Sequence, residues 1–122
     1  MKKLLIVDDD PMITRFLKIV LEKTGRFKVQ TENKGANALA AAETFKPDII
    51  ILDVNMPDVE GGVVASQLKA HENLKNIPVI FLTGSVTEEE ADTQITIGDN
   101  SVIAKPINLE KLVDCIERNT TG

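Results

Sequence analysis

Four apolar runs in this 122-residue chain each end in polar side chains that could do chemistry. Runs of bulky apolar residues without alternation are typical of strands buried on both faces of a parallel sheet. The carboxyl ends of such strands meet at one edge of the sheet, where open α/β folds bind their ligands. We therefore expect the polar residues after these runs to lie together. The runs are 4–7, 49–52, 79–82 and 102–104, and the residues that follow them are Asp8, Asp9, Asp53, Thr83 and Lys105.

The three acids of this set, Asp8, Asp9 and Asp53, would repel one another strongly. Carboxylates about 5 Å apart repel by roughly 3 kcal/mol per pair at an effective dielectric constant near 20. Such a cluster either takes up a proton or binds a cation. Mg²⁺ prefers oxygen ligands, takes only a few carboxylates and keeps several waters. The sequence therefore predicts a Mg²⁺ site with open positions.

The same cluster has the composition of a phosphoryl acceptor. Mg²⁺ and Lys105 would neutralise the transferring oxygens, and Thr83 would add a hydroxyl donor, while Asp53 attacks in line. The product would be an aspartyl phosphate, a known class of covalent intermediate.

Strands and helices alternate along the chain in a pattern that can position these residues. A strand pattern begins near residues 3, 27, 49, 78 and 101, and a helix pattern begins near residues 11, 36, 64, 88 and 109. Asp10 is a suitable N-cap for the first helix, with Pro11 at its first position. The apolar stripe expected to cover the sheet from this helix is Ile13, Phe16, Leu17, Val20 and Leu21.

The strand order follows from which strands look buried. The run 27–32 alternates apolar and polar residues, as a half-exposed edge strand does. Crossovers between parallel strands are right-handed almost without exception. The pattern predicts an α/β fold, a flavodoxin-like (βα)5 three-layer sandwich with a parallel five-stranded sheet in the order 2-1-3-4-5. The fourth helix, expected at about 88–97, is rich in β-branched residues, so we expect it to be the least stable.

Composition narrows the class of protein. The chain is 43% hydrophobic and 27% charged, as in an ordinary globular domain, and we expect one domain over residues 1–122 with a polar tail or linker from 119 to 122. The net charge of -5 and the lack of a basic stripe argue against nucleic-acid binding by this domain. No apolar run approaches the roughly 20 residues that span a membrane. A single cysteine, Cys115, suits a reducing cytoplasm.

Four motifs, at these spacings and in this order, resemble the receiver domain of bacterial two-component response regulators, over essentially the whole chain. Each motif alone is weak, whereas the four together are specific. The motifs are Val7-Asp8-Asp9, Asp53-x-x-Met56-Pro57-x-x-x-Gly61, Leu82-Thr83-Gly84 and Lys105-Pro106.

The resemblance implies a signalling switch, rather than an enzyme acting on a separate substrate. Asp53 would accept a phosphoryl group from a sensor histidine kinase or a phosphotransfer protein. The resemblance also implies a cis peptide bond between Lys105 and Pro106. It assigns Mg²⁺ binding to Asp9, Asp53 and the backbone carbonyl of Asn55, with Asp8 acting through water, and phosphoryl binding to Thr83 and Lys105.

One position departs from the family pattern. Receiver domains often carry an aromatic residue three positions before the lysine, and this chain has Val102 there. An aromatic switch is therefore absent, and we expect the signal to pass through Thr83, the loop 84–87 and the fourth helix.

Three alternatives remain open on sequence alone. A haloacid-dehalogenase-like phosphatase would use Asp8 as its nucleophile, although the acids expected after the lysine strand and room for a cap domain are missing. A binding module of the same fold would work without phosphorylation. A flavin-binding role is disfavoured because the acids after the first strand would repel the phosphate of FMN.

Overall fold

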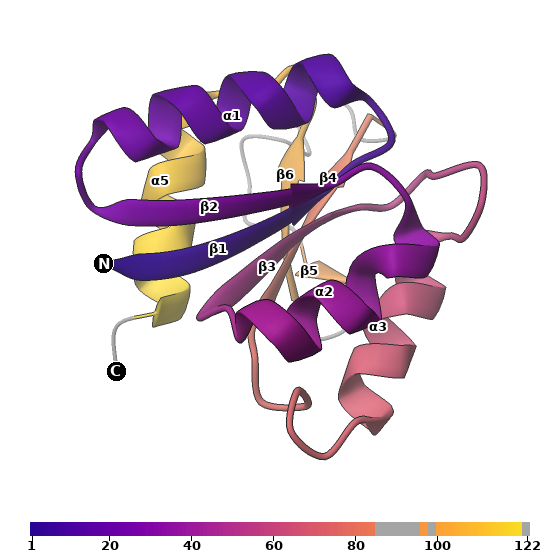
Figure 1. Cartoon of the computed structure of the whole chain (residues 1–122). Coiled ribbons are helices and arrows are strands. Elements are labelled where there is room, and N and C mark those ends of the chain that lie inside the picture. The colour runs from indigo at the N-terminus through magenta and orange to yellow at the C-terminus, as the bar shows by residue number, and fades with distance from the viewer. Residues whose placement is uncertain (85–95, 98–99, 121–122) are drawn as a thin grey trace.

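The computed structural model of the chain describes residues 1–84, 96–97 and 100–120. Its described strands and helices follow the order that the sequence patterns predict, and one short strand is added at the edge of the sheet beside the last predicted strand (Figure 1). In chain order the elements are β1 (Lys2–Val7), α1 (Pro11–Lys23), β2 (Phe27–Glu32), the 3-10 helix η1 (Gly35–Asn37), α2 (Ala38–Phe45), β3 (Ile49–Asp53), α3 (Gly61–Ala70), β4 (Val79–Thr83), β5 (Thr96–Ile97), β6 (Asn100–Ala104) and α5 (Leu109–Thr120).

The parallel strands lie in the order β2-β1-β3-β4-β6, which confirms the predicted order 2-1-3-4-5 for the five parallel strands. The short strand β5 pairs antiparallel with β6 at the outer edge. Figure 1 shows α1 and α5 on one side of this sheet and α2 and α3 on the other. The expected three-layer flavodoxin-like sandwich is confirmed.

The sheet has an apolar core on each face because β1, β3 and β4 send alternate side chains to opposite sides. On one side, residues such as Leu5 and Leu52 pack against α2 and α3. On the other side, residues such as Ile6 and Ile51 pack against α1 and α5. All of the residues of β3 are buried, as expected for a central strand covered on both faces.

The first helix begins as its sequence predicts. The side chain of Asp10 accepts a hydrogen bond from the backbone N–H of Met12 at 2.9 Å, and Pro11 occupies the first helical position. The expected apolar stripe is wrong at one position, because Phe16 is 57% exposed whereas Leu17 and Leu21 are buried. The other four residues of the stripe belong to the core cluster on this face or pack against it, and Phe16 lies outside that cluster.

The fourth helix cannot extend to residue 97, as its pattern suggested. Thr96 and Ile97 form β5 and pair with Ser101 and Asn100 of β6. Both residues are β-branched, and such residues fit a pleated strand better than a helix. The remainder of that predicted helix, up to residue 95, lies outside the described residues.

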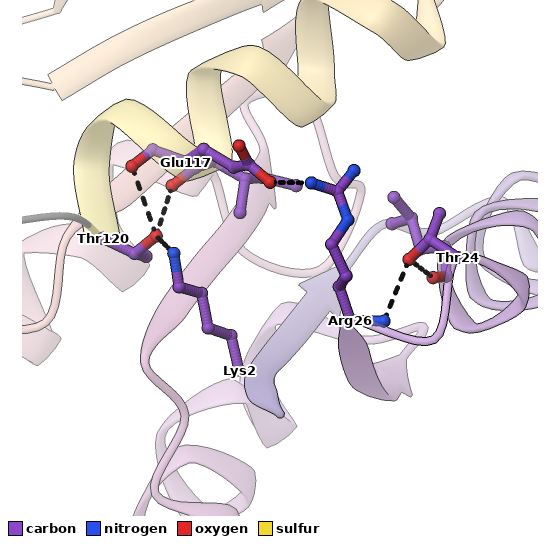
Figure 2. A network of polar contacts seen from close by, with 7 residues as sticks. Lys2, Thr24, Arg26, Glu117 and Thr120 are labelled. Atoms are coloured by element: carbon purple, nitrogen blue, oxygen red, sulfur yellow. Dashed lines mark hydrogen bonds and ion pairs between the residues drawn. The ribbon is translucent and has the colours of Figure 1, made fainter.

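The polar tail expected from Asn119 is shorter than predicted, because α5 runs through Thr120. Asn119 Nδ2 donates to the carbonyl of Cys115 at 2.8 Å, and the hydroxyl of Thr120 donates to the carbonyl of Ile116 at 2.8 Å. Figure 2 shows how this end of α5 is attached to the rest of the fold. Lys2 Nζ donates to Thr120 Oγ1 at 2.7 Å, and Arg26, just before β2, pairs with Glu117.

We expect α5 to be held by its buried face more than by these surface contacts. Truncating the fully buried Leu112 to alanine should destabilise the domain by about 3 kcal/mol, since it removes packing and leaves a cavity. Arg26→Ala should lower stability by less than about 1 kcal/mol, because its ion pair with Glu117 is exposed. Urea unfolding followed by far-ultraviolet circular dichroism measures both, and equal losses would contradict this ranking.

Candidate functional site: an acidic pocket at the carboxyl ends of the strands

The acids predicted to meet at the sheet edge do meet. In the parallel register between β1 and β3, Val7 is the Cα partner of Leu52, so Asp8 and Asp53 come next on neighbouring strands. One carboxylate oxygen from each of Asp8, Asp9 and Asp53 lies within 4.8 Å of the others. Asp8 and Asp53 are buried and Asp9 is exposed, so the cluster is open to solvent on one side.

Lys105 brings a positive charge to this pocket from the end of β6. Its Nζ lies 3.0 Å from Asp8 Oδ2 and 3.4 Å from Asp53 Oδ1. The backbone N–H of Lys105 donates to the carbonyl of Thr83 at 2.8 Å, which fixes the start of the loop after β6 against the end of β4. The Lys105–Pro106 peptide bond is cis, as the family resemblance implied.

Thr83 and Asn55 complete the set of residues predicted for the site. Thr83 is 4% exposed and follows Leu82, the Cα partner of Asp53, so it lies at the same end of the sheet. Asn55 has an exposed side chain, and its backbone N–H donates to Asp53 Oδ1 at 3.3 Å. The structure therefore brings together all of the side chains predicted at the strand ends, and places the Asn55 backbone beside them.

The pocket holds more negative than positive charge, and this excess contributes to the pKa shifts of its groups. Burial, the charge of Asp8 and a hydrogen bond with Asp9 raise the pKa of Asp53 to about 6, and Lys105 and the Asn55 N–H offset only part of this shift. Burial by itself would lower the pKa of Lys105, but its ion pairs with Asp8 and Asp53 outweigh that effect and raise it. The ammonium therefore stays charged.

These residues fit a hard cation such as Mg²⁺. Asp8 Oδ1 accepts a hydrogen bond from the Asp10 N–H at 3.0 Å, whereas the buried Oδ2 has no aligned hydrogen-bond donor among the described residues despite the nearby ammonium. Buried carboxylate oxygens without donors are costly unless they bind a proton, water or metal. Three carboxylates with one open side match the preference of Mg²⁺ for a few acidic ligands plus water.

An apolar cleft adjoins the pocket and shares Lys105 with it. The cleft has a volume of about 410 Å³ and is lined by Met12, Ile13, Phe16, Pro106 and Ile107 in addition to Lys105. Met12 is 80% exposed and Phe16 is 57% exposed, so α1 presents large apolar side chains to solvent beside the acids. Sequence reasoning assigned Phe16 to the core, yet Met12 and Phe16 four residues apart mark a second helical face.

The chain belongs to the family of response regulator receiver domains, since the model of that family matches residues 4–117. A probable transcriptional regulatory protein, TcrX of Mycobacterium tuberculosis, is 33% identical over 89% of this chain and 45% of its own length. The solved structure of the chemotaxis protein CheY4 of Vibrio cholerae is 31% identical, covers 98% of each chain and superposes with a TM-score of 0.83.

A second solved structure is informative about the pocket. The receiver domain of a sensor histidine kinase from Pseudomonas aeruginosa, 25% identical with a TM-score of 0.83 and coverage of 98% of this chain and 97% of its own, holds a magnesium ion in its active-site cleft. Receiver domains are signalling modules of two-component systems, and the acidic cluster of this chain fits a phospho-accepting site. The chain spans less than half the length of the mycobacterial regulator. None of the described helices is long and apolar enough to cross a membrane.

The close approach of Gly61 to Asp53 should be essential to the pocket. A Cβ at Gly61 would lie 2.3 Å from the carbonyl oxygen of Asp53, whereas a Cβ at Gly62 would meet nothing within 4 Å. Gly61→Ala should therefore displace the backbone of Asp53 and lower stability by about 1 to 3 kcal/mol. Gly62→Ala should be neutral or slightly stabilising, because alanine is the better helix former. Chemical denaturation of both variants tests this difference.

The raised pKa of Asp53 predicts a specific dependence of stability on pH without metal. The pKa of Asp53 is about 6 in the folded state and 3.8 in the unfolded state. Its contribution to folding stability is therefore favourable below pH 4, where the carboxyl is protonated, and is lost as the pH rises to about 6. Asp53→Asn should thus be more stable than wild type at pH 7.5 by on the order of 2 kcal/mol. The gain should shrink towards pH 4.

Thermal unfolding in EDTA between pH 4 and pH 7.5 measures this effect. Asp58→Asn provides the opposite control, because backbone N–H donors, that of Ala36 foremost, lower the pKa of Asp58. Its charged form stabilises the fold above that pKa, so removing the charge should destabilise the domain at pH 7.5. A pH-independent difference for Asp53→Asn would contradict the electrostatic account.

Proposed function

We propose that this domain is a phosphorylation-dependent switch in which Asp53 accepts a phosphoryl group from a histidine kinase or a phosphotransfer protein. The observation that carries the proposal is the convergence of Asp8, Asp9 and Lys105 on Asp53. We further propose that residues 1–122 act as one phosphoacceptor unit in the cytoplasm, where a kinase has access to ATP.

The proposed transfer is a single displacement at phosphorus. A carboxylate oxygen of Asp53 forms the new P–O bond, the P–N bond to the donor imidazole breaks, and its electron pair leaves with the imidazole nitrogen. Asp53 must be ionised to attack, and its pKa of about 6 leaves it mostly charged at pH 7.5. The same pocket would then catalyse the slow attack of water that removes the phosphoryl group.

Each of the other site residues has a proposed part. Lys105, close to both buried carboxylates, would pair with a phosphoryl oxygen once Asp53 is modified. Thr83, at the end of β4, would donate its hydroxyl to another such oxygen. Asp9, Asp53 and the carbonyl of Asn55 would hold Mg²⁺, with Asp8 acting through water. When bound, Mg²⁺ would supply positive charge for the transferring oxygens.

The switch itself would start at Thr83. Val102 lies opposite Phe81 in the sheet and packs against the core cluster that contains it, so this position offers no aromatic ring to reorient. Movement of Thr83 toward the phosphoryl group would instead be the first step in the shift between the two states of the switch.

Intact mass spectrometry after incubation with phosphoramidate tests the proposal. Wild type with Mg²⁺ should gain one phosphoryl adduct, which EDTA and Asp53→Asn should each abolish. Asp48→Asn, an exposed acid just before β3, should leave the adduct unchanged. No adduct on wild type would favour a phosphorylation-independent binding module. An adduct that survives in Asp53→Asn would assign the chemistry to another carboxylate, with Asp8 the first candidate.

We also propose that the apolar cleft beside the pocket receives the helix that carries the donor histidine. Lys105 lines both the cleft and the acidic pocket, so an apolar helix seated against Met12 and Phe16 would place its histidine near Asp53. Exposed apolar side chains grouped beside a reactive site are typical of a protein interface.

Phe16→Ala should therefore lower the rate of transfer from a kinase that phosphorylates wild type by about tenfold or more, as for an interface anchor. Its phosphorylation by phosphoramidate should be unchanged, because a small donor needs no docking surface. Ile19→Ala is the matched control, since Ile19 is also exposed on α1 but does not line the cleft. Equal effects of both substitutions on kinase transfer would contradict the assignment of the cleft.

A further inference from the structure

The turn that follows β2 contacts two loops beside the acidic pocket, namely the β1–α1 loop, which carries Asp8 and Asp9, and the β3–α3 loop, which begins directly after Asp53. On one side, Asn33 Nδ2 donates to the carbonyl oxygen of Asp8 at 2.9 Å and to Thr14 Oγ1 at 3.0 Å. The carbonyl of Asp8 belongs to the peptide unit that joins Asp8 to Asp9. A hydrogen bond to it therefore fixes the plane of that peptide and the direction in which Asp9 leaves the chain.

The buried Thr14 anchors this contact to the fold. Thr14 lies in the first turn of α1, and its hydroxyl donates to the carbonyl of Pro11 at 3.2 Å. The amide of Asn33 thus joins the end of β1 to the start of α1 across the loop that contains the acids. Asp8 Oδ1 is another acceptor in this loop, and it accepts a hydrogen bond from the N–H of Asp10 at 3.0 Å.

On its other side, the same turn holds the loop between β3 and α3. The backbone N–H groups of Gly35 and Ala36 donate to the two carboxylate oxygens of Asp58, at 3.2 and 3.0 Å. These donors lower the pKa of Asp58, so the carboxylate is charged at neutral pH. Asp58 lies three residues after Asn55, in the loop that supplies the proposed metal-binding carbonyl.

The turn and the β3–α3 loop also approach each other closely at Gly35. A Cβ at Gly35 would lie 3.1 Å from Met56 Cε and 3.2 Å from the Val59 carbonyl oxygen. Glycine at this position leaves room for the β3–α3 loop to lie against the turn. The hydrogen bonds to Asp58 and this packing act on the same short segment.

We propose that residues 33–36 form a brace that holds the β1–α1 and β3–α3 loops at the separation Mg²⁺ needs, with Asn33 and Asp58 as positioning residues. The inference rests on the proposed function, because it concerns the proposed Mg²⁺ site. The mutual repulsion of Asp8, Asp9 and Asp53 pushes the two loops apart in the absence of metal. Contacts that resist this movement keep the ligands close before the metal arrives, so binding requires less rearrangement.

Titration calorimetry with Mg²⁺ tests the brace on Asn33→Ala, Asp58→Ala and the double variant. Each single substitution should weaken Mg²⁺ binding by about tenfold, the lower end of the range for groups that orient metal ligands. The change in the free energy of Mg²⁺ binding in the double variant should differ from the sum of the changes in the two single variants, because both contacts hold one turn. Melting temperatures in EDTA are measured in parallel to monitor stability.

Two control variants separate positioning from nonspecific effects. Asn37→Ala alters the exposed asparagine that directly follows the brace, whose side chain makes no capping hydrogen bond. Glu60→Gln removes a charge from the β3–α3 loop at a side chain that likewise makes no capping hydrogen bond. Both controls should bind Mg²⁺ as wild type does. If Glu60→Gln weakens Mg²⁺ binding as much as Asp58→Ala does, the effect of Asp58 is one of charge alone. That result would overturn the role of Asp58 in the brace.

The failure of the brace and the failure of the proposed function give different results. The brace would be overturned if wild type binds Mg²⁺ and both Asn33→Ala and Asp58→Ala bind it with the same affinity. This holds even if both variants melt at a lower temperature. Wild type that binds no Mg²⁺ at millimolar concentration would overturn the proposed metal site itself. Reduced affinity in both variants with intact controls would support the brace.

Discussion

The repulsion among Asp8, Asp9 and Asp53 is the constraint on which the site depends. The core favours this arrangement because the strands bearing two of these acids are buried against helices on both faces. The acids themselves oppose it, because burial first and then the charge of Asp8 raise the pKa of Asp53. Lys105 compensates for part of the excess charge, and the remainder is the electrostatic basis for affinity toward a cation and for reactivity toward an electrophilic phosphorus. The repulsion at this edge of the sheet therefore lowers folding stability, and the same repulsion is what the function uses.

The central part of the fold could be predicted from sequence because its signals are local and agree with one another. The run Ile49 to Leu52 has no polar residue, and the strand it predicts is buried throughout. The alternating run 27–32 correctly marked an edge strand. The convergence of the acids followed from parallel strands alone, since adjacent strand ends share one edge. In this region local propensity and tertiary packing favour the same answer.

The features that sequence reasoning missed are those that depend on contacts between distant segments. Phe16 fits the helical spacing of the core stripe, and only the packing of α1 in the folded domain shows that it is exposed and lies outside the core cluster. Asn33 carries no motif, and Asp58 looks like an ordinary acid of a turn. Their contacts span 25 and 22 to 23 residues, so no local pattern contains them. Thr96 and Ile97 form a strand because β6 offers an open edge, which is again a tertiary effect.

The parallel register of β1 and β3 also limits where residues can be inserted or deleted as this sequence evolves. Inserting or deleting one residue inside either strand would turn its terminal acid to the opposite face and shift it by about 3.3 Å. By contrast, connections at the amino ends of the strands lie away from the acids, and doubling the length of a flexible loop adds only about 0.6 kcal/mol. Insertions should therefore accumulate in segments such as 71–78, between α3 and β4, while the spacing from each strand to its acid stays fixed.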